Sequence, residues 1–154
     1  MLDKLISNDN FCDFMHNNVK ETIGFLLQNN VEFGVICNTS EVIFEPSLPH
    51  DILKNIKPIA LFVLSNYSFE SAYMDEGGES LFFEAGFGPE NFASTVSIDT
   101  SNIIQIIVED TPIFINVCAG RKKIIKKPEI KKVETENRSM EKLLSRPENQ
   151  KFLK

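Results

Sequence analysis

The spacing of hydrophobic residues predicts one long amphipathic helix near the start of the chain. Over residues 10–30, large apolar side chains recur every three or four positions: Phe11, Phe14, Met15, Val19, Ile23, Leu26 and Leu27. This is the spacing of side chains along one face of an α-helix. Asn29 and Asn30 tolerate left-handed backbone conformations, so they mark the predicted end of the helix.

Beyond the predicted helix, the pattern changes to short apolar segments separated by turn residues, which is typical of β-strands. The predicted strands span residues 31–37, 42–44, 59–64, 69–74, 81–87, 92–98, 102–108 and 113–118. Prolines interrupt residues 45–58, so this stretch is expected to be a loop with at most one helical turn. We therefore predict a mainly β fold with one N-terminal α-helix, arranged as a small Sm-like or SH3-like open barrel or as a two-sheet sandwich.

Charge divides the 154-residue chain into an acidic body and a basic tail. Residues 1–120 hold 4 basic and 17 acidic residues, a net charge of −13, whereas residues 121–154 hold 12 basic and 5 acidic residues, a net charge of +7. Residues 121–138 are mostly Lys, Glu, Asn and Pro, with few large apolar side chains to bury. A folded domain over residues 1–120 is therefore expected, followed by a disordered basic tail.

Cysteine usage and hydropathy favour a protein of the cytoplasm. Cys12, Cys37 and Cys118 are an odd number at wide spacings, which predicts reduced thiols rather than a disulfide framework. No apolar run approaches the roughly 20 residues that span a bilayer, and the first residues lack the pattern of a secretory signal. We expect no association with a membrane.

The residues that usually mark catalytic or metal chemistry do not occur in the required spacings. His16 and His50 stand far apart, each expected on the surface or on a helix face, and no Cys-x-x-Cys pair occurs, so no metal site is predicted. Phosphate-loop, dinucleotide-binding and nucleophile-elbow motifs are absent from the sequence. Asp75, Glu76 and Glu79 fit a solvated hairpin tip better than a carboxylate cluster. No enzyme activity and no cofactor are expected.

The order of several short motifs resembles a known family. They are Phe25-Leu26-Leu27-Gln28-Asn29-Asn30 before the strand at Val31, Ile59-Ala60-Leu61-Phe62-Val63, Phe83-Glu84-Ala85-Gly86-Phe87-Gly88, Val96-Ser97-Ile98, residues 103–109, and a chain end with Arg146-Pro147 before Lys151-Phe152-Leu153-Lys154. In this order they resemble the stringent starvation protein B (SspB) family, adaptors that deliver ssrA-tagged proteins to the ClpXP protease. The chain departs from the family pattern at Phe62, Gly86, Pro89 and Asp99 and in having a basic tail.

The resemblance implies three sites and a domain plan. A groove for the tag peptide would be lined by Leu61, Val63, Phe83, Ala85, Gly86, Phe87 and Gly88. The helix would form a homodimer through Phe11, Phe14, Met15, Val19 and Ile23. The tail end would dock on the ClpX ATPase through Arg146, Pro147, Lys151, Phe152, Leu153 and Lys154. The plan is then an SspB-like peptide-binding domain over residues 1–120, a flexible basic linker over residues 121–145 and a docking motif over residues 146–154.

Three alternatives stay open at the level of sequence. Phe83, Ala85 and Phe87 fit a core as well as a groove, and the apolar helix face fits packing on its own sheet as well as a dimer contact. A small Sm-like barrel that binds RNA through its tail would use Lys122, Lys123, Lys126, Lys127, Lys131 and Lys132. Two features oppose it: the body is strongly acidic, and the tail has no aromatic side chain for base stacking before Phe152.

Overall fold

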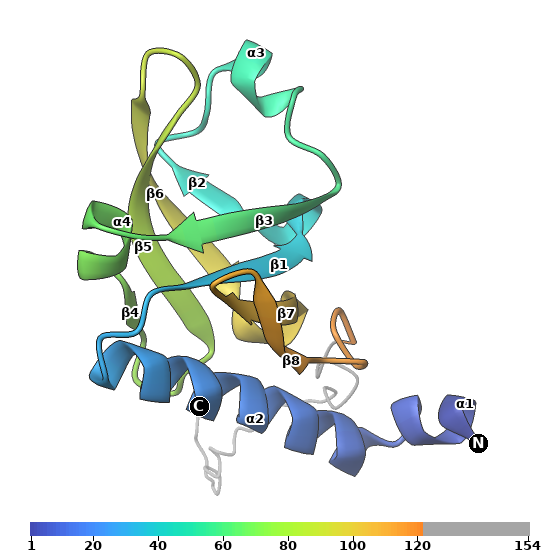
Figure 1. Cartoon of the computed structure of the whole chain (residues 1–154). Helices are drawn as coiled ribbons and strands as arrows, with labels where there is room; N and C mark the ends of the chain where they lie inside the picture. Colours follow the sequence, from blue (N-terminus) through green and yellow to red (C-terminus); the bar gives the residue numbers. More distant parts are fainter. Residues whose placement is uncertain (122–154) are drawn as a thin grey trace, which may run out of the picture. The chain divides into compact units, whose positions relative to one another are not determined.

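The structure, a computed structural model, describes residues 1–121, which form two four-stranded antiparallel sheets and a long N-terminal helix (Figure 1). The helices are α1 (Leu2–Ile6), α2 (Asp9–Gln28), α3 (His50–Leu53) and α4 (Tyr67–Glu70). The strands are β1 (Phe33–Asn38), β2 (Ile43–Glu45), β3 (Ile59–Leu64), β4 (Tyr73–Met74), β5 (Ser80–Phe87), β6 (Phe92–Asp99), β7 (Ile103–Val108) and β8 (Thr111–Ile115). The prediction of a mainly β fold behind an N-terminal helix is confirmed, and the sheets are not closed into a barrel.

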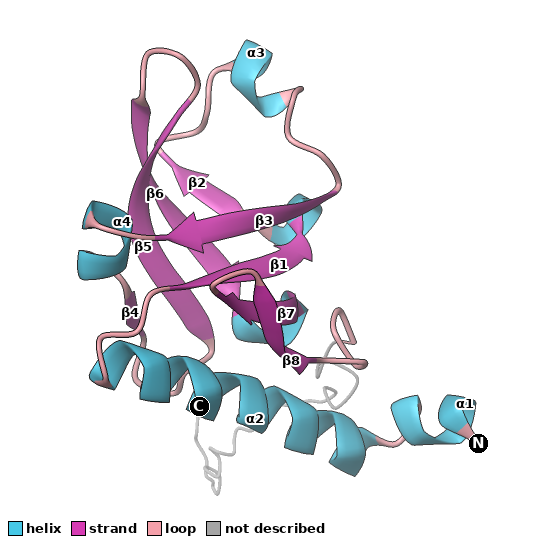
Figure 2. Cartoon of the chain, in the orientation of Figure 1, coloured by secondary structure: helices cyan, strands magenta, loops and turns pink. Residues whose placement is uncertain are grey.

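The strand order is β3-β1-β7-β8 in one sheet and β2-β6-β5-β4 in the other (Figure 2). The chain therefore changes sheets four times, and two of these changes, from β1 to β2 and from β6 to β7, pass through similar corners. At each corner an Asn or Asp side chain caps a short 3₁₀ turn: Asn38 accepts from the Ser40 N–H at 3.0 Å, and Asp99 accepts from the Ser101 N–H at 2.9 Å. The Asn102 amide then donates to the Asn38 carbonyl at 2.9 Å. This hydrogen bond ties the two corners to each other.

The core lies between the sheets and is covered at one end by α2. Fully buried side chains from the strands include Val35, Leu64, Leu81, Phe83, Val96, Ile98, Ile103 and Ile106. Helix α2 adds Val19, Ile23 and Leu26 to this cluster. The helix begins where the Asn8 side chain accepts from the Phe11 N–H at 3.0 Å, which satisfies one of the unpaired donors of its first turn.

Three local predictions differ from the structure. The segment predicted as a strand over residues 69–74 forms α4 and then only the two-residue strand β4. A left-handed Asn66 (φ 54°) and the Ser68 hydroxyl, which bonds to both the N–H and the carbonyl of Ser65, start a helical turn here. The last strand ends at Ile115 rather than at residue 118. The short helix α1 was not predicted.

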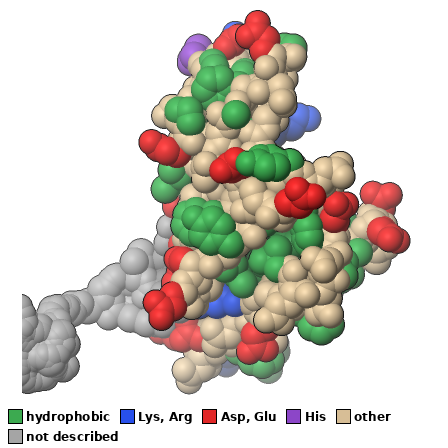
Figure 3. Space-filling model, turned by 90° about the vertical axis from the view of Figure 1, so that its left-hand side faces the viewer, with side chains coloured by type: hydrophobic (Ala, Val, Ile, Leu, Met, Phe, Trp, Pro, Cys, Tyr) green, Lys and Arg blue, Asp and Glu red, His purple; other side chains and the backbone are tan. Residues whose placement is uncertain are grey.

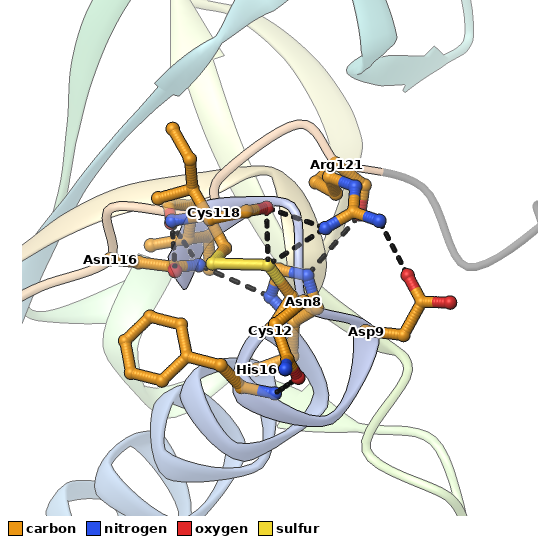
Figure 4. Close-up of a disulfide and its surroundings, with 10 residues drawn as sticks. Asn8, Asp9, Cys12, His16, Asn116, Cys118 and Arg121 are labelled. Atoms are coloured by element: carbon orange, nitrogen blue, oxygen red, sulfur yellow. Dashed lines mark hydrogen bonds and ion pairs between the residues drawn. A yellow bond between two sulfur atoms is a disulfide. The ribbon is translucent and has the colours of Figure 1, made fainter. Parts of the chain in front are cut away.

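A disulfide corrects the prediction of three reduced thiols. Cys12 on α2 and Cys118, which follows β8, are bonded to each other, with a Cα–Cα distance of 5.5 Å (Figure 4). Wide spacing in the sequence hid this pair, since 106 positions separate the two residues. Cys37 is the remaining free thiol, and burial in the core raises its pKa to about 12.

Polar groups lie around the disulfide and provide hydrogen-bond partners for His16, the buried histidine of α2 (Figure 4). The Asn116 amide lies 3.3 Å from His16 Nδ1, and His16 Nε2 lies 3.3 Å from the Arg121 carbonyl oxygen. The Arg121 guanidinium donates to the Ile6 carbonyl and pairs with Asp9. His16 is therefore buried on the inner face of α2, where hydrogen bonds to Asn116 and Arg121 meet the polar needs of its ring.

Candidate functional site

A cavity of the described domain opens where β3 ends beside β5 and β6. Its volume is about 680 Å³. Four parts of the chain line it: the end of β2, the end of β3 with the start of α4, the second half of β5, and the Asn91 turn with β6. The lining residues are Glu45, Pro46, Val63, Ser65, Asn66, Tyr67, Ser68, Glu84, Ala85, Gly86, Asn91, Ala93, Ser94 and Thr95. We call this cavity the acidic groove, because its only charged side chains are Glu45 and Glu84.

Strand pairing places the two carboxylates of the acidic groove in one row across the second sheet. Glu84 on β5 pairs with Thr95 on β6, and Thr95 pairs with Glu45 on β2. With strands roughly 5 Å apart, the two glutamates lie about 10 Å from each other at the backbone, with Thr95 between them. Figure 3 shows the side of the domain that carries α4 and β5, where acidic and hydrophobic side chains are spread and basic ones are sparse.

Tyr67 and Glu84 form the wall between α4 and β5. The Tyr67 hydroxyl donates to Glu84 Oε1 at 2.5 Å, and the Glu84 N–H donates to Ser71 Oγ at 2.9 Å. The hydrogen bond to Glu84, together with the negative charge of that carboxylate, raises the pKa of Tyr67 above its ordinary value. Tyr67 therefore stays a neutral hydrogen-bond donor, and α4 is fixed to β5 at the mouth of the groove.

A second, mostly apolar cavity lies at the other end of β3. It measures about 420 Å³ and is lined by Asn55, Ile56, Lys57, Ile59, Ala60, Leu61, Phe62 and Phe87. We call it the apolar pocket. Behind it, Phe87 packs edge-on against Phe44, and Phe62 contacts Phe83, so the floor is continuous with the core. Lys57 is its only charged residue and forms no ion pair within residues 1–121.

Strand β3 joins the acidic groove to the apolar pocket. It pairs only with β1 within the described residues, so its other side is a free edge. Alternate side chains Ile59, Leu61 and Val63 point out of the sheet and are each half or more exposed. Gly34 on β1 leaves room for one of them, because a Cβ there would lie 2.9 Å from Leu61 Cδ1. The exposed edge and its apolar side chains form a surface to which an extended chain can pair.

The structure separates the expected groove residues into four groups. Val63, Ala85 and Gly86 line the acidic groove, whereas Leu61 and Phe87 line the apolar pocket. Phe83 is 2% exposed and belongs to the core. Gly88 has a positive φ of 76° in the turn after β5, where a Cβ would lie 2.8 Å from Ile52 Cδ1. Gly86 faces Asn91, whose Oδ1 would lie 1.8 Å from an added Cβ.

The expected dimer residues of α2 lie on different faces of the helix. Val19 and Ile23 are fully buried against the sheets of the same chain, so in this conformation they are not available to a second copy. Phe14 is 60% exposed and lies beside the half-buried Phe11, with ring centroids 6.4 Å apart. Met15 is half-buried. Of the expected dimer residues, Phe14 is therefore the one that is more than half exposed, and Phe25 farther along α2 is exposed to a similar extent.

Two further predictions lie outside the described residues: the docking motif over residues 146–154 and the basic linker apart from its first residue, Arg121, which contacts Ile6 and Asp9. Sequence reasoning also missed Glu45, Tyr67 and Asn91, which line the acidic groove. Nothing in the sequence around each of these residues indicates that they share a cavity, since three separate turns bring them together. Glu84 was missed as well, although alternation along β5 places it on the face opposite Phe83, together with the predicted Gly86.

The chain matches no protein-family model and no curated protein. Within residues 1–121, no group of three His, Cys, Asp or Glu side chains is placed to hold a metal ion. None of the helices in this part of the chain has the length and apolar content needed to cross a membrane. The assignment of the candidate site therefore rests on the geometry of the structure, in which an acidic groove and an apolar pocket lie along one edge strand.

Proposed function

We propose that the chain is a protease adaptor of the SspB type, which binds ssrA-type degradation tags and delivers the tagged proteins to ClpXP. The observation that carries this proposal is the open groove beside the free edge of β3, where Val63 meets Ala85 and Gly86. Extended peptides bind at such edges, with backbone hydrogen bonds giving affinity and side-chain cavities giving specificity. The motifs in the sequence support the resemblance to the SspB family, and the groove is the candidate binding site for the tag.

The adaptor role also needs a second contact, which we assign to residues 146–154. Phe152 and Leu153 are an adjacent apolar pair between Lys151 and Lys154 at the end of the chain. Two such side chains bury enough area for only a weak contact with ClpX. Tag and ATPase contacts on one chain act together, because the first makes the second intramolecular and gives an effective concentration of about 1 mM.

The proposal is tested by separating the two contacts in one reconstituted degradation reaction. Ala85→Arg fills the groove, so it should abolish binding of an ssrA-type peptide, measured by fluorescence anisotropy, and with it the stimulated degradation. Replacing Phe152 and Leu153 by Ala should leave peptide binding intact and abolish stimulation. Thr111→Arg, on the far edge strand β8, adds the same bulk and charge and should change neither. Full stimulation by Ala85→Arg and by the double alanine variant would refute the proposal.

A further inference from the structure

We infer that the acidic groove and the apolar pocket are two ends of one site, which selects an extended segment with a large apolar side chain at one end and Lys or Arg at the other. The inference rests on the proposed function and specifies the class of peptide. Leu61 lines the apolar pocket and Val63 lines the acidic groove, two positions along on the same face of β3. A strand paired with the free edge of β3 would pass both cavities.

The length of β3 sets the spacing of the two selected side chains. The outward side chains run from Ile59 to Val63, four residue steps, or about 13 Å along a strand. An extended ligand covers this distance with four steps of its own. Positions i and i+4 of a strand point to the same face, so the apolar and the basic side chain can enter their cavities together.

The chemistry of each end determines which side chain it accepts. At one end, the walls are Ile56, Ile59, Leu61 and Phe87, and burial of an aliphatic or aromatic side chain there removes apolar surface from water. At the other end, a cationic side chain above Thr95 would have the Glu84 carboxylate on one side and the Glu45 carboxylate on the other. Both glutamates belong to strands next to β6, whose backbones lie roughly 5 Å from that of Thr95, so both carboxylates would attract the cation electrostatically.

Charge also determines which end of the bound segment lies in which cavity. Lys57 lies beside the apolar pocket without an ion pair in the described domain, and no Lys or Arg lines the acidic groove. A bound segment with its cation near Glu84 is attracted by the carboxylates of Glu84 and Glu45. A segment with a carboxylate at that position is repelled by both. The site therefore discriminates against acidic side chains at that one position.

Four synthetic peptides test this specificity on the full chain. Each carries fluorescein and Gly-Ser flanks around a core of Lys-Ala-Ala-Ala-Leu, the reversed core Leu-Ala-Ala-Ala-Lys, or the same two cores with Glu in place of Lys. Of the two lysine peptides, the one with the higher affinity should bind about tenfold more tightly than the peptide with Glu in place of its Lys, as measured by anisotropy titration. The difference should shrink at high ionic strength, because the groove is open to solvent.

Paired variants assign each end of the peptide to its cavity. Glu84→Gln combined with Glu45→Gln should remove the preference for Lys over Glu, whereas Glu90→Gln in the turn before β6, outside the lining, should keep it. Leu61→Ser should weaken every peptide that carries Leu. Ile113→Ser is the matched control, because Ile113 is 47% exposed on the opposite edge strand β8, against 50% for Leu61.

The outcomes separate this inference from the function on which it rests. If an ssrA-type peptide binds but lysine and glutamate cores bind equally well, or if the double glutamine variant keeps the preference, the inference is wrong and the peptide-binding role survives. If neither the ssrA-type peptide nor any of the four cores binds, both fail. A preference for Lys that disappears only in the double glutamine variant supports the inference.

Discussion

Glu84 links the charge of the acidic groove to its shape. Its carboxylate accepts the Tyr67 hydroxyl, and its backbone N–H donates to Ser71, so one residue of β5 holds both ends of α4. The same carboxylate stands two strands from Glu45 in the row through Thr95. A change at Glu84 therefore alters the position of Tyr67 and the potential of the groove together.

Replacing this carboxylate by an amide should be visible in the titration of Tyr67. A phenol that donates to a carboxylate loses this stabilisation on ionising and also gains a like charge beside it, so its pKa lies above the ordinary value. Glu84→Gln removes the negative charge and should lower the pKa of Tyr67 toward that value. Absorbance at the phenolate band, followed against pH in a Tyr73→Phe background, measures the change.

The control for this titration is Glu90→Gln, which removes one exposed carboxylate outside the groove and should leave the midpoint unchanged. Identical midpoints for Glu84→Gln and the parent protein would contradict the hydrogen bond.

At the scale of elements, the periodicity of α2 predicted the helix and the later part of its buried face, Val19, Ile23 and Leu26, but not the part near its start. The buried residues are Cys12, His16, Val19, Ile23 and Leu26, a regular stripe in which Cys12 and His16 are not strongly apolar. A disulfide and two hydrogen bonds satisfy them, so they occupy core positions that hydropathy alone assigns to Phe11, Phe14 and Met15. Contacts with residues far away in the sequence determine which face of α2 is buried, and the hydropathy pattern within the helix does not reveal these contacts.

Phe14→Asp tests whether the exposed Phe14 of α2 forms a dimer contact. Phe14 is exposed within the chain, so the substitution should spare the fold and convert a dimer on α2 into monomers in sedimentation velocity. Asn17→Asp adds the same charge at an exposed position of α2 and should leave the oligomeric state unchanged. Val19→Asp should instead unfold the domain, because it buries an unpaired carboxylate. A Phe14→Asp protein that sediments like the parent would exclude a dimer through Phe14.

The disulfide should contribute strongly to stability, because it joins α2 to the chain beyond β8 across 106 positions. Closing a loop of that length restricts the unfolded chain, and the double substitution Cys12→Ser with Cys118→Ser should lower the free energy of unfolding by about 3–5 kcal/mol. Urea denaturation with and without a dithiol reductant measures the loss. The reductant should destabilise the parent and leave the double variant unaffected; equal urea midpoints for the parent in both conditions would contradict a disulfide in the folded protein.

For the whole molecule, the strand pattern predicted a mainly β fold because alternation and turn residues are local signals, whereas it left an open barrel and a two-sheet sandwich as alternatives. The prediction of β3 at residues 59–64 agrees with the structure, and β5 and β6 differ by one residue at an end. The acidic groove was only half predicted: Val63, Ala85 and Gly86 came from short motifs, while Glu45 and Tyr67 enter through the pairing of β2 and the turn at Asn66. Such pairings are properties of the assembled sheets.

Binding of an extended peptide along the free edge of β3 underlies both the proposed function and the proposed specificity. Amide chemical shifts of the full chain, followed during titration with an ssrA-type peptide, test it directly. The largest shifts should fall on residues 59–65, 84–87 and 93–95, the stretches that border the two cavities and the free edge. Shifts confined to β8 or to α2, with residues 59–65 unchanged at saturation, would contradict it.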